Sequence, residues 1–223
     1  MCRLDSVSQS WAVMALGRTE HTAQAVESAW SALYDGEWGL LRRMTPPVED
    51  QLHAGEISAL CPGAGMNGGQ DTLAAVWMLA ALCLLGQRER AWQLLHALNP
   101  LNHTAGAEET AVFALEPWLL PGGMTDRGRA MADSGSGAAG LMYSVIMTHM
   151  LGLQRRGDRL RLAPMVPEGW DMLTLTLRHG ASTWHLEARN DVSAVTCDGE
   201  DCPAGWIPLR DDGRIHQVYA PIR

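Results

Sequence analysis

LAAVWMLAALCLL, residues 73–85, is the stretch that decides the fold. All its side chains are apolar, so a helix formed by it has no polar side to turn toward water. A helix that is apolar all round is buried among other elements. The run is shorter than the roughly 18–20 residues that cross a membrane, so we interpret it as a core helix and not as a membrane span. Gly86 follows it and is typical of a helix end.

Helical patterns precede this run. Asp5 or Ser6 can cap a helix from about residue 7 to residue 16, which ends at Gly17. Residues 20–34 carry one apolar stripe at helical spacing, formed by Ala23, Val26, Ala29, Trp30 and Leu33. Amphipathic helices of this kind bury one face against a neighbour, so the stripe predicts a helix packed on the core.

Helices and loops also alternate after residue 40. Residues 71–85 and 88–98 form a predicted helical hairpin, and residues 138–151 form a further helix. Residues 41–66 and 121–140 have no clear period and are rich in Pro, Gly, Ser and Asp. Long loops within compact domains are uncommon and often functional, so residues 41–66, which we interpret as such a loop, are a candidate for a site.

The last quarter of the chain changes to an alternating pattern. Leu173, Leu175 and Leu177 face one way, a turn follows at 179–182, and a second alternating run covers 184–188. Short strands are predicted near 160–162, 192–197, 205–209 and 215–220. The sequence therefore predicts a mainly α fold with a small antiparallel β module at the C-terminus, divided into domains 1–156 and 157–223.

Composition narrows the class of protein. The chain has 223 residues, 47% of them hydrophobic and 19% charged, which is typical of a globular protein. Its net charge of −8 argues against nucleic acid and anionic membranes as main partners. The first residues lack the apolar core of a secretory signal, and the five cysteines form no CxxC pair. We expect reduced thiols and a cytoplasmic location; Cys197 and Cys202 either pair or, as we favour, stay free.

Common catalytic and metal motifs are missing from the sequence. It contains no HExxH or P-loop pattern and no GxGxxG that follows a predicted strand, so we expect no metal site and no nucleotide cofactor. Asp5, Ser6 and His21 are the residue types of a hydrolase triad, but helix capping explains the first two.

Several phrases, taken in order, resemble a known family. They are CRLDSVSQSWAV (2–13), TPP (45–47), NGGQ (67–70), AAVW (74–77), RAWQLLHALNPLNH (90–103), LEPW (115–118), SGAAGLMY (136–143) and GDRLRLAPMVPEGW (157–170). Together they are similar to the C-terminal part of glycoside hydrolase family 94. That family includes cellobiose and chitobiose phosphorylases and a region of cyclic β-1,2-glucan synthases.

The resemblance implies a fold and a reaction. It implies part of an (α/α)6 barrel followed by a β domain, and inverting phosphorolysis of β-linked glucose oligosaccharides. Inorganic phosphate is then the co-substrate, no cofactor is needed, and one aspartate protonates the leaving oxygen. In relatives this aspartate lies in a Trp-Asn-Asp stretch that this sequence lacks, so no catalytic residue is expected here. We expect a C-terminal fragment that works only if a chain encoded upstream supplies the rest of the barrel.

Two segments match the binding residues of the family. Ser136 and Gly137 correspond to a Thr/Ser-Gly pair that contacts phosphate; without the resemblance, Ser136 is simply a helix cap. Asn67, Gly68, Gly69 and Gln70 correspond to a substrate-binding loop.

The substrate-binding loop departs from the family pattern at three positions. Met66, Asp71 and Leu73 replace a Glu, a Tyr and a His of relatives. We therefore favour the interpretation that Asp71 and Thr72 only turn the chain and cap a helix. Glu116 of LEPW is a further candidate for substrate binding, although a structural role is favoured for it.

Other functions stay open at this point. The chain is either part of an enzyme, a carbohydrate-binding module without catalysis, or a structural remnant. In the second case Trp11, Trp77 and Trp118 are candidates to stack on sugar rings, because their broad apolar faces match pyranose C–H faces; Trp is equally common in cores.

Overall fold

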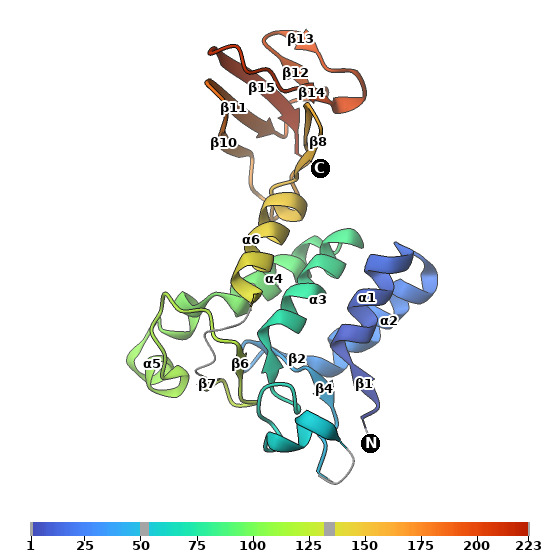
Figure 1. The fold of residues 1–223 in the computed structure, drawn as a ribbon, viewed down its shortest axis with the longest axis vertical. Helices are drawn as coiled ribbons and strands as arrows, with labels where there is room; N and C mark the ends of the chain where they lie inside the picture. Colours follow the sequence, from blue (N-terminus) through green and yellow to red (C-terminus); the bar gives the residue numbers. More distant parts are fainter. Residues whose placement is uncertain (1, 50–53, 132–136, 223) are drawn as a thin grey trace. The chain divides into compact units, whose positions relative to one another are not determined.

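The computed structural model describes residues 2–49, 54–131 and 137–222. The chain forms two compact units, Met1–Tyr143 and Ser144–Arg223 (Figure 1). The division falls within helix α6 (Ala138–Val145). The predicted domains 1–156 and 157–223 stay a prediction.

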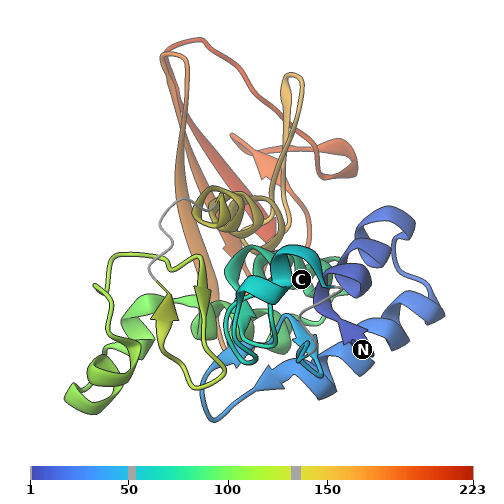
Figure 2. The same ribbon diagram turned by 60° about the horizontal axis from the view of Figure 1, so that its bottom comes forward.

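Four helices form the centre of the first unit. They are α1 (Ser6–Leu16), α2 (Glu20–Leu33), α3 (Thr72–Leu84) and α4 (Arg88–Leu98). They pack in the order α2, α1, α3, α4, which can be followed in Figures 1 and 2. The apolar run that suggested a core helix is α3, and its Met78, Leu79 and Leu82 have no exposed surface.

Polar side chains cap the first turns of α1 and α2, and the cap of α1 is Asp5, one of the two predicted candidates. The Asp5 carboxylate accepts hydrogen bonds from the N–H groups of Val7 and Ser8 and so caps α1. Thr19 and Thr22 form a reciprocal capping box at the start of α2. Such caps satisfy N–H groups that the first helical turn leaves without partners.

Loops with short elements connect and follow the central helices. They include η1 (Gly55–Ala59), η2 (Pro100–His103) and α5 (Ala107–Phe113). Seven two-residue strands lie among them: β1 (Leu4–Asp5), β2 (Tyr34–Asp35), β3 (Leu40–Leu41), β4 (Met44–Thr45), β5 (Gln70–Asp71), β6 (Gly123–Met124) and β7 (Ala130–Met131). The pairs β1–β4 and β5–β6 join segments that are distant in the sequence, whereas β2–β3 and β6–β7 pair neighbouring segments.

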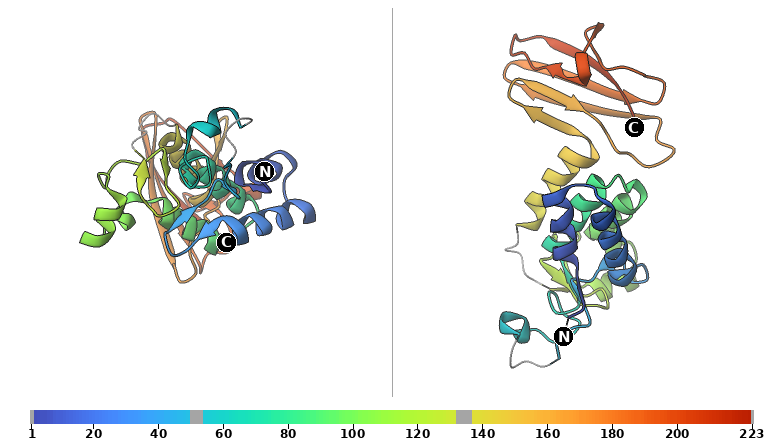
Figure 3. Two further views of the ribbon diagram at one scale, coloured as in Figure 1. Left: turned by 90° about the horizontal axis from the view of Figure 1, so that it is seen from below. Right: turned by 90° about the vertical axis from the view of Figure 1, so that its right-hand side faces the viewer.

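The second unit is a two-layer β structure. Helix α6 continues as η3 (Ile146–Met150) and leads into it. One sheet has the order β14 (Ile207–Pro208), β9 (Arg159–Leu162), β8 (Leu153–Arg156). The other has the order β10 (Met172–His179), β11 (Ser182–Arg189), β15 (Ile215–Pro221), β12 (Thr196–Cys197), β13 (Glu200–Asp201). Apolar side chains from both sheets share one core, and Figure 3 shows the strands of this part in orange and red.

The predicted fold class is wrong in two respects. Over the described residues the chain has six α-helices and fifteen strands in five sheets, so it is mixed α and β and not mainly α. The expected antiparallel C-terminal module also contains a long parallel pair, in which β11 and β15 run from Thr183↔Ile215 to Arg189↔Pro221. A two-residue strand has no periodicity to detect, and a pairing across thirty residues of sequence is not local.

Among the described residues, no helix has both the length and the apolar character needed to cross a membrane.

Candidate functional site

Asn67 lies at the centre of a packed junction. Its side chain has no exposed surface. Its Oδ1 accepts a hydrogen bond from Val48 N at 2.7 Å, and its Nδ2 donates to the carbonyls of Val48 and Leu60 at 3.0 and 2.9 Å. All these partners are backbone groups. The amide therefore holds two loop segments together, because a buried polar side chain needs such partners.

The two glycines next to it fit where a larger residue does not. Gly68 has a φ of +88°, and a Cβ there would lie 2.8 Å from Pro47 Cβ. A Cβ on Gly69 would lie 2.3 Å from the carbonyl oxygen of Met124 and 2.6 Å from Gly65 N. Backbone atoms at these distances cannot move aside easily, so Gly69 is required by close packing of the chain itself.

Gln70 makes the last connection of this junction and is also buried. Its Oε1 accepts a hydrogen bond from Leu41 N at 3.0 Å, and its Nε2 donates to Met124 Sδ at 3.2 Å. The residue lies in β5, which pairs with Met124 in β6. The side chains of Asn67 and Gln70 are thus both engaged with the protein.

Arg43 joins this junction to two helix starts. Asp71 Oδ1 accepts from the N–H groups of Leu73 and Ala74 and caps α3, as the sequence suggested. Arg43 lies 3.2 Å from the carboxylate of Asp5, the cap of α1, and 4.0 Å from that of Asp71. The N–H of Arg43 also donates to Gly69 O at 2.6 Å. One arginine therefore pairs with both capping carboxylates.

The structure shows fewer contacts for the other predicted site residues. Gly137 is exposed at the start of α6, where its carbonyl accepts from Leu141 N. Glu116 is exposed, and Ser136 lies outside the described residues. In the part of the chain that the structure describes, no hydrogen bond links Asn67 or Gln70 to Gly137 or Glu116. The phosphate and substrate roles of these residues stay predictions.

A cavity of about 400 Å³ lies elsewhere in the first unit. Its wall comes from the segment after α2, the end of α4, η2 and α5; it includes Tyr34, Glu37, Trp38, His96, Asn102, His103, Glu108, Glu109, Val112 and Phe113. Aromatic rings, imidazoles and acidic side chains thus share one hollow. Its volume falls in the range of small-molecule sites.

Packing fixes several rings of this cavity. His103 stacks on Phe113 with ring centroids 5.1 Å apart, and its Nε2 lies 2.7 Å from Ala97 O. Tyr34 stacks on Trp30 with centroids 4.2 Å apart. Burial raises the pKa of the Tyr34 phenol, with a further contribution from the charge of Asp35. Rings held in this way can receive a ligand with little loss of side-chain freedom.

This cavity is not apparent from the sequence. Its residues come from three separated segments, 34–39, 96–113 and Gly128. No motif spans them; the Trp38-Gly39 pair and the Asn102-His103 pair were the available signals, and both are common in loops. The tryptophans singled out from the sequence lie elsewhere. Trp11 and Trp77 contact each other edge to face at 5.3 Å on α1 and α3, and Trp118 is 76% exposed.

Comparison with known proteins assigns the family. Residues 1–152 match the family model described as the glycosyl hydrolase 94 superfamily, catalytic domain. The chain is 30% identical over 196 residues to cyclic β-(1,2)-glucan synthase NdvB of Rhizobium meliloti (strain 1021), covering 85% of this chain and 7% of that protein. It is 25% identical over 224 residues to solabiose phosphorylase of Paenibacillus borealis, covering 95% of this chain and 28% of that protein.

A third relative is another phosphorylase. N,N'-diacetylchitobiose phosphorylase of Vibrio proteolyticus is 25% identical over 176 residues, which cover 75% of this chain and 22% of that protein. The chain thus spans less than a third of the length of each of these relatives. Because the family model matches well over half of it, the chain belongs to the glycosyl hydrolase 94 superfamily.

Proposed function

We propose that this chain is the C-terminal part of a glycoside phosphorylase or cyclic β-1,2-glucan synthase-like enzyme that acts on β-linked glucose oligosaccharides. The reaction is inverting phosphorolysis with inorganic phosphate as co-substrate, and it needs no cofactor. The general acid comes from the rest of the catalytic domain. The match of residues 1–152 to the family carries this proposal.

The proposed reaction requires these residues only to bind and orient the phosphate. Phosphate attacks the anomeric carbon as nucleophile, and an acid protonates the leaving glycosidic oxygen, so the reaction requires no protein base. The protein must hold the phosphate in line with the bond that breaks. Gly137 and Ser136 are our proposed phosphate contacts, since a helix of eight residues begins at Ala138 and its first N–H groups favour anions.

The segment Asn67–Gln70 has a supporting role in this proposal. Its side chains bind backbone groups of the protein, and its glycines fill a close contact. In this proposal it positions the surrounding loops and leaves direct contact with the sugar to other residues. The loss of the Glu and His of relatives at Met66 and Leu73 is consistent with such a supporting role.

A second candidate function is carbohydrate binding without catalysis. The cavity favours it, because Tyr34 and Trp38 offer aromatic faces while Glu37, Glu108 and Glu109 offer acceptors for sugar hydroxyls. The same acidic groups repel phosphate, so the cavity suits a neutral saccharide better than an anion.

Release of glucose 1-phosphate tests the first candidate. The chain is assayed with β-1,2-glucan oligomers, cellobiose and inorganic phosphate, first alone and then co-expressed with the rest of the catalytic domain. We expect product only in the second sample. No product from a folded, complete domain would refute phosphorolysis.

Calorimetric titration with the same oligomers tests the second candidate. Trp38→Ala, which alters the cavity wall, is compared with Trp118→Ala, which removes an exposed ring elsewhere. Binding that only Trp38→Ala weakens would support the cavity as a saccharide site, and equal binding by both variants would exclude it.

A further inference from the structure

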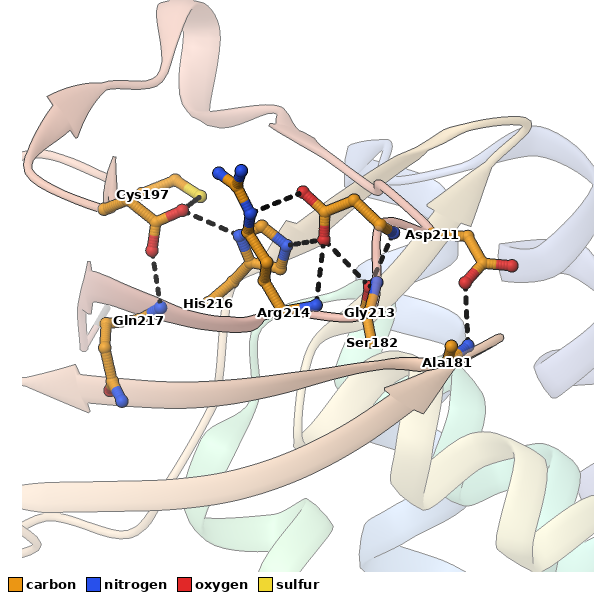
Figure 4. A network of polar contacts seen from close by, with 10 residues as sticks. Ala181, Ser182, Cys197, Asp211, Gly213, Arg214, His216 and Gln217 are labelled. Atoms are coloured by element: carbon orange, nitrogen blue, oxygen red, sulfur yellow. Dashed lines mark hydrogen bonds and ion pairs between the residues drawn. The ribbon is translucent and has the colours of Figure 1, made fainter.

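Three side chains of types that can bind a metal ion meet in the second unit. Ligand atoms of Cys197, Asp198 and His216 all lie within 4.8 Å of one another. Nδ1 of His216 is 2.7 Å from Asp198 Oδ2, and Cys197 Sγ is 3.8 Å from the same oxygen. Figure 4 shows this group, with dashed lines joining His216 to neighbours on both sides.

The backbone fixes all three residues. Cys197 ends β12, which pairs with Val218 of β15, two residues after His216. Asp198 turns the chain toward β13 with a φ of +53°. Its N–H donates to Gln217 O at 2.8 Å, and its Oδ1 accepts from Gln217 N at 2.9 Å. Oδ2 is therefore held toward the imidazole.

A second carboxylate orients the imidazole from its other side. His216 is 3% exposed, and its ring stacks on Trp184 with centroids 4.0 Å apart. Its Nε2 lies 3.1 Å from Asp212 Oδ1. That oxygen also accepts from Ser182 Oγ and Arg214 N, both at 3.1 Å. Metal-bound histidines usually donate their second N–H to such a carboxylate, which fixes the tautomer and the ring orientation.

We propose that Cys197, Asp198 and His216 bind a divalent zinc ion, with Asp212 holding the imidazole so that Nδ1 faces the metal. Thiolate, imidazole and carboxylate together are a typical donor set for Zn²⁺, and a water molecule completes its four-coordinate geometry. Binding displaces the thiol proton of Cys197 and the proton shared by His216 and Asp198. The donors need only small shifts, since Zn²⁺ ligand bonds are roughly 2.0–2.3 Å long.

The charges around the cluster favour a cation. Asp198 Oδ2 and Asp212 Oδ1 lie 2.7 and 3.1 Å from the two ring nitrogens of His216. These two carboxylates attract a bound dication, whose charge in turn stabilises the thiolate of Cys197. No spacing in the sequence predicts this cluster, because its ligands come from a turn and from a strand about twenty residues later. Zinc would add a second connection between that turn and β15, beside the pairing of β12 with β15.

Titration of the full chain with Co²⁺ as a spectroscopic probe, and with Zn²⁺ by calorimetry, tests the proposal. We expect saturation at one equivalent, with the visible bands of tetrahedral Co²⁺ and a thiolate charge-transfer band. Cys197→Ala should abolish the charge-transfer band, whereas Cys61→Ala, which removes an exposed thiol of the first unit, should keep it.

Two neighbouring carboxylates provide a matched comparison. Asp211 and Asp212 both support the same turn, but Asp211 binds Ala181 N and does not touch His216. Asp212→Asn should weaken metal binding about 10–100-fold, as is usual for outer-shell partners, and Asp211→Asn should leave it unchanged. A folded wild-type chain without saturable Co²⁺ binding, or a charge-transfer band that survives Cys197→Ala, would overturn the proposal.

Discussion

Replacement of Asn67 by alanine distinguishes a supporting residue from a ligand contact. The variant loses three hydrogen bonds, those with Val48 N, Val48 O and Leu60 O. At roughly 0.5–1.5 kcal/mol net for each bond, the loss is about 1.5–4.5 kcal/mol. Val48 and Leu60 are half-buried, so water reaches some of the freed backbone groups. We therefore expect a loss of about 1.5–3 kcal/mol in the free energy of unfolding.

Urea denaturation followed by far-ultraviolet circular dichroism measures this change, because helices α1 to α5 all belong to the first unit. Asn102→Ala is the matched control. It removes one amide, whose Nδ2 donates to His96 O at an exposed position, so its cost should stay below about 1 kcal/mol. If Asn67→Ala unfolds within about 0.5 kcal/mol of the wild type, the supporting role is refuted. A loss of oligosaccharide binding without loss of stability would instead make Asn67 a ligand contact.

The remaining predictions concern packing, pH and surface charge. Gly69→Ala should lower the unfolding free energy by about 2 kcal/mol or more because its Cβ meets backbone atoms. Gly140→Ala, on an open face of α6, should instead raise the unfolding free energy by up to about 1 kcal/mol. Urea denaturation of both variants measures these changes. Burial lowers the pKa of His149, so the unfolded chain binds more protons below pH about 6.5, and stability should fall as the pH drops below that value and stay level above it. Melting temperatures at pH 7.5 and 5.5 test this, and the same drop in His149→Gln would contradict it. Glu27→Gln removes an exposed ion pair with Arg90 and should cost under about 1 kcal/mol, a difference that 1 M salt should remove.

Elements with a strong local pattern could be predicted from the sequence. Helices α1, α2, α3 and α4 begin and end within about two residues of the predicted limits, because apolar spacing and caps such as Asp5 are local signals. The hairpin β10–β11 was equally clear, since its leucines alternate and the chain turns between His179 and Ser182. What could not be predicted depends on contacts distant in sequence. The strands β1 to β7 have two residues each, and β15 pairs in parallel with β11 although a long segment of sequence separates the two strands.

The candidate site was predictable only in part. The sequence directs attention to Asn67 and Gln70, but only the structure shows that their side chains bind Val48, Leu60 and Leu41. An amide in a loop has the same appearance in a sequence whether it faces a ligand or the backbone. The cavity near Trp38 and the cluster around His216 escaped prediction for a related reason. Each is assembled from segments that come together only when the sheets and helices pack.

The position of Arg43 has a mechanical consequence for the first unit. Its side chain lies between the carboxylates that cap α1 and α3, its N–H binds Gly69, and its carbonyl accepts from Ser6 N. A slide of either helix by a single residue, about 1.5 Å along its axis, would pull one cap off this arginine and also strain the loop at Gly69. The two helices and the loop therefore move as one rigid frame. Larger motions of the first unit are therefore expected in its other loops, while this frame keeps its shape.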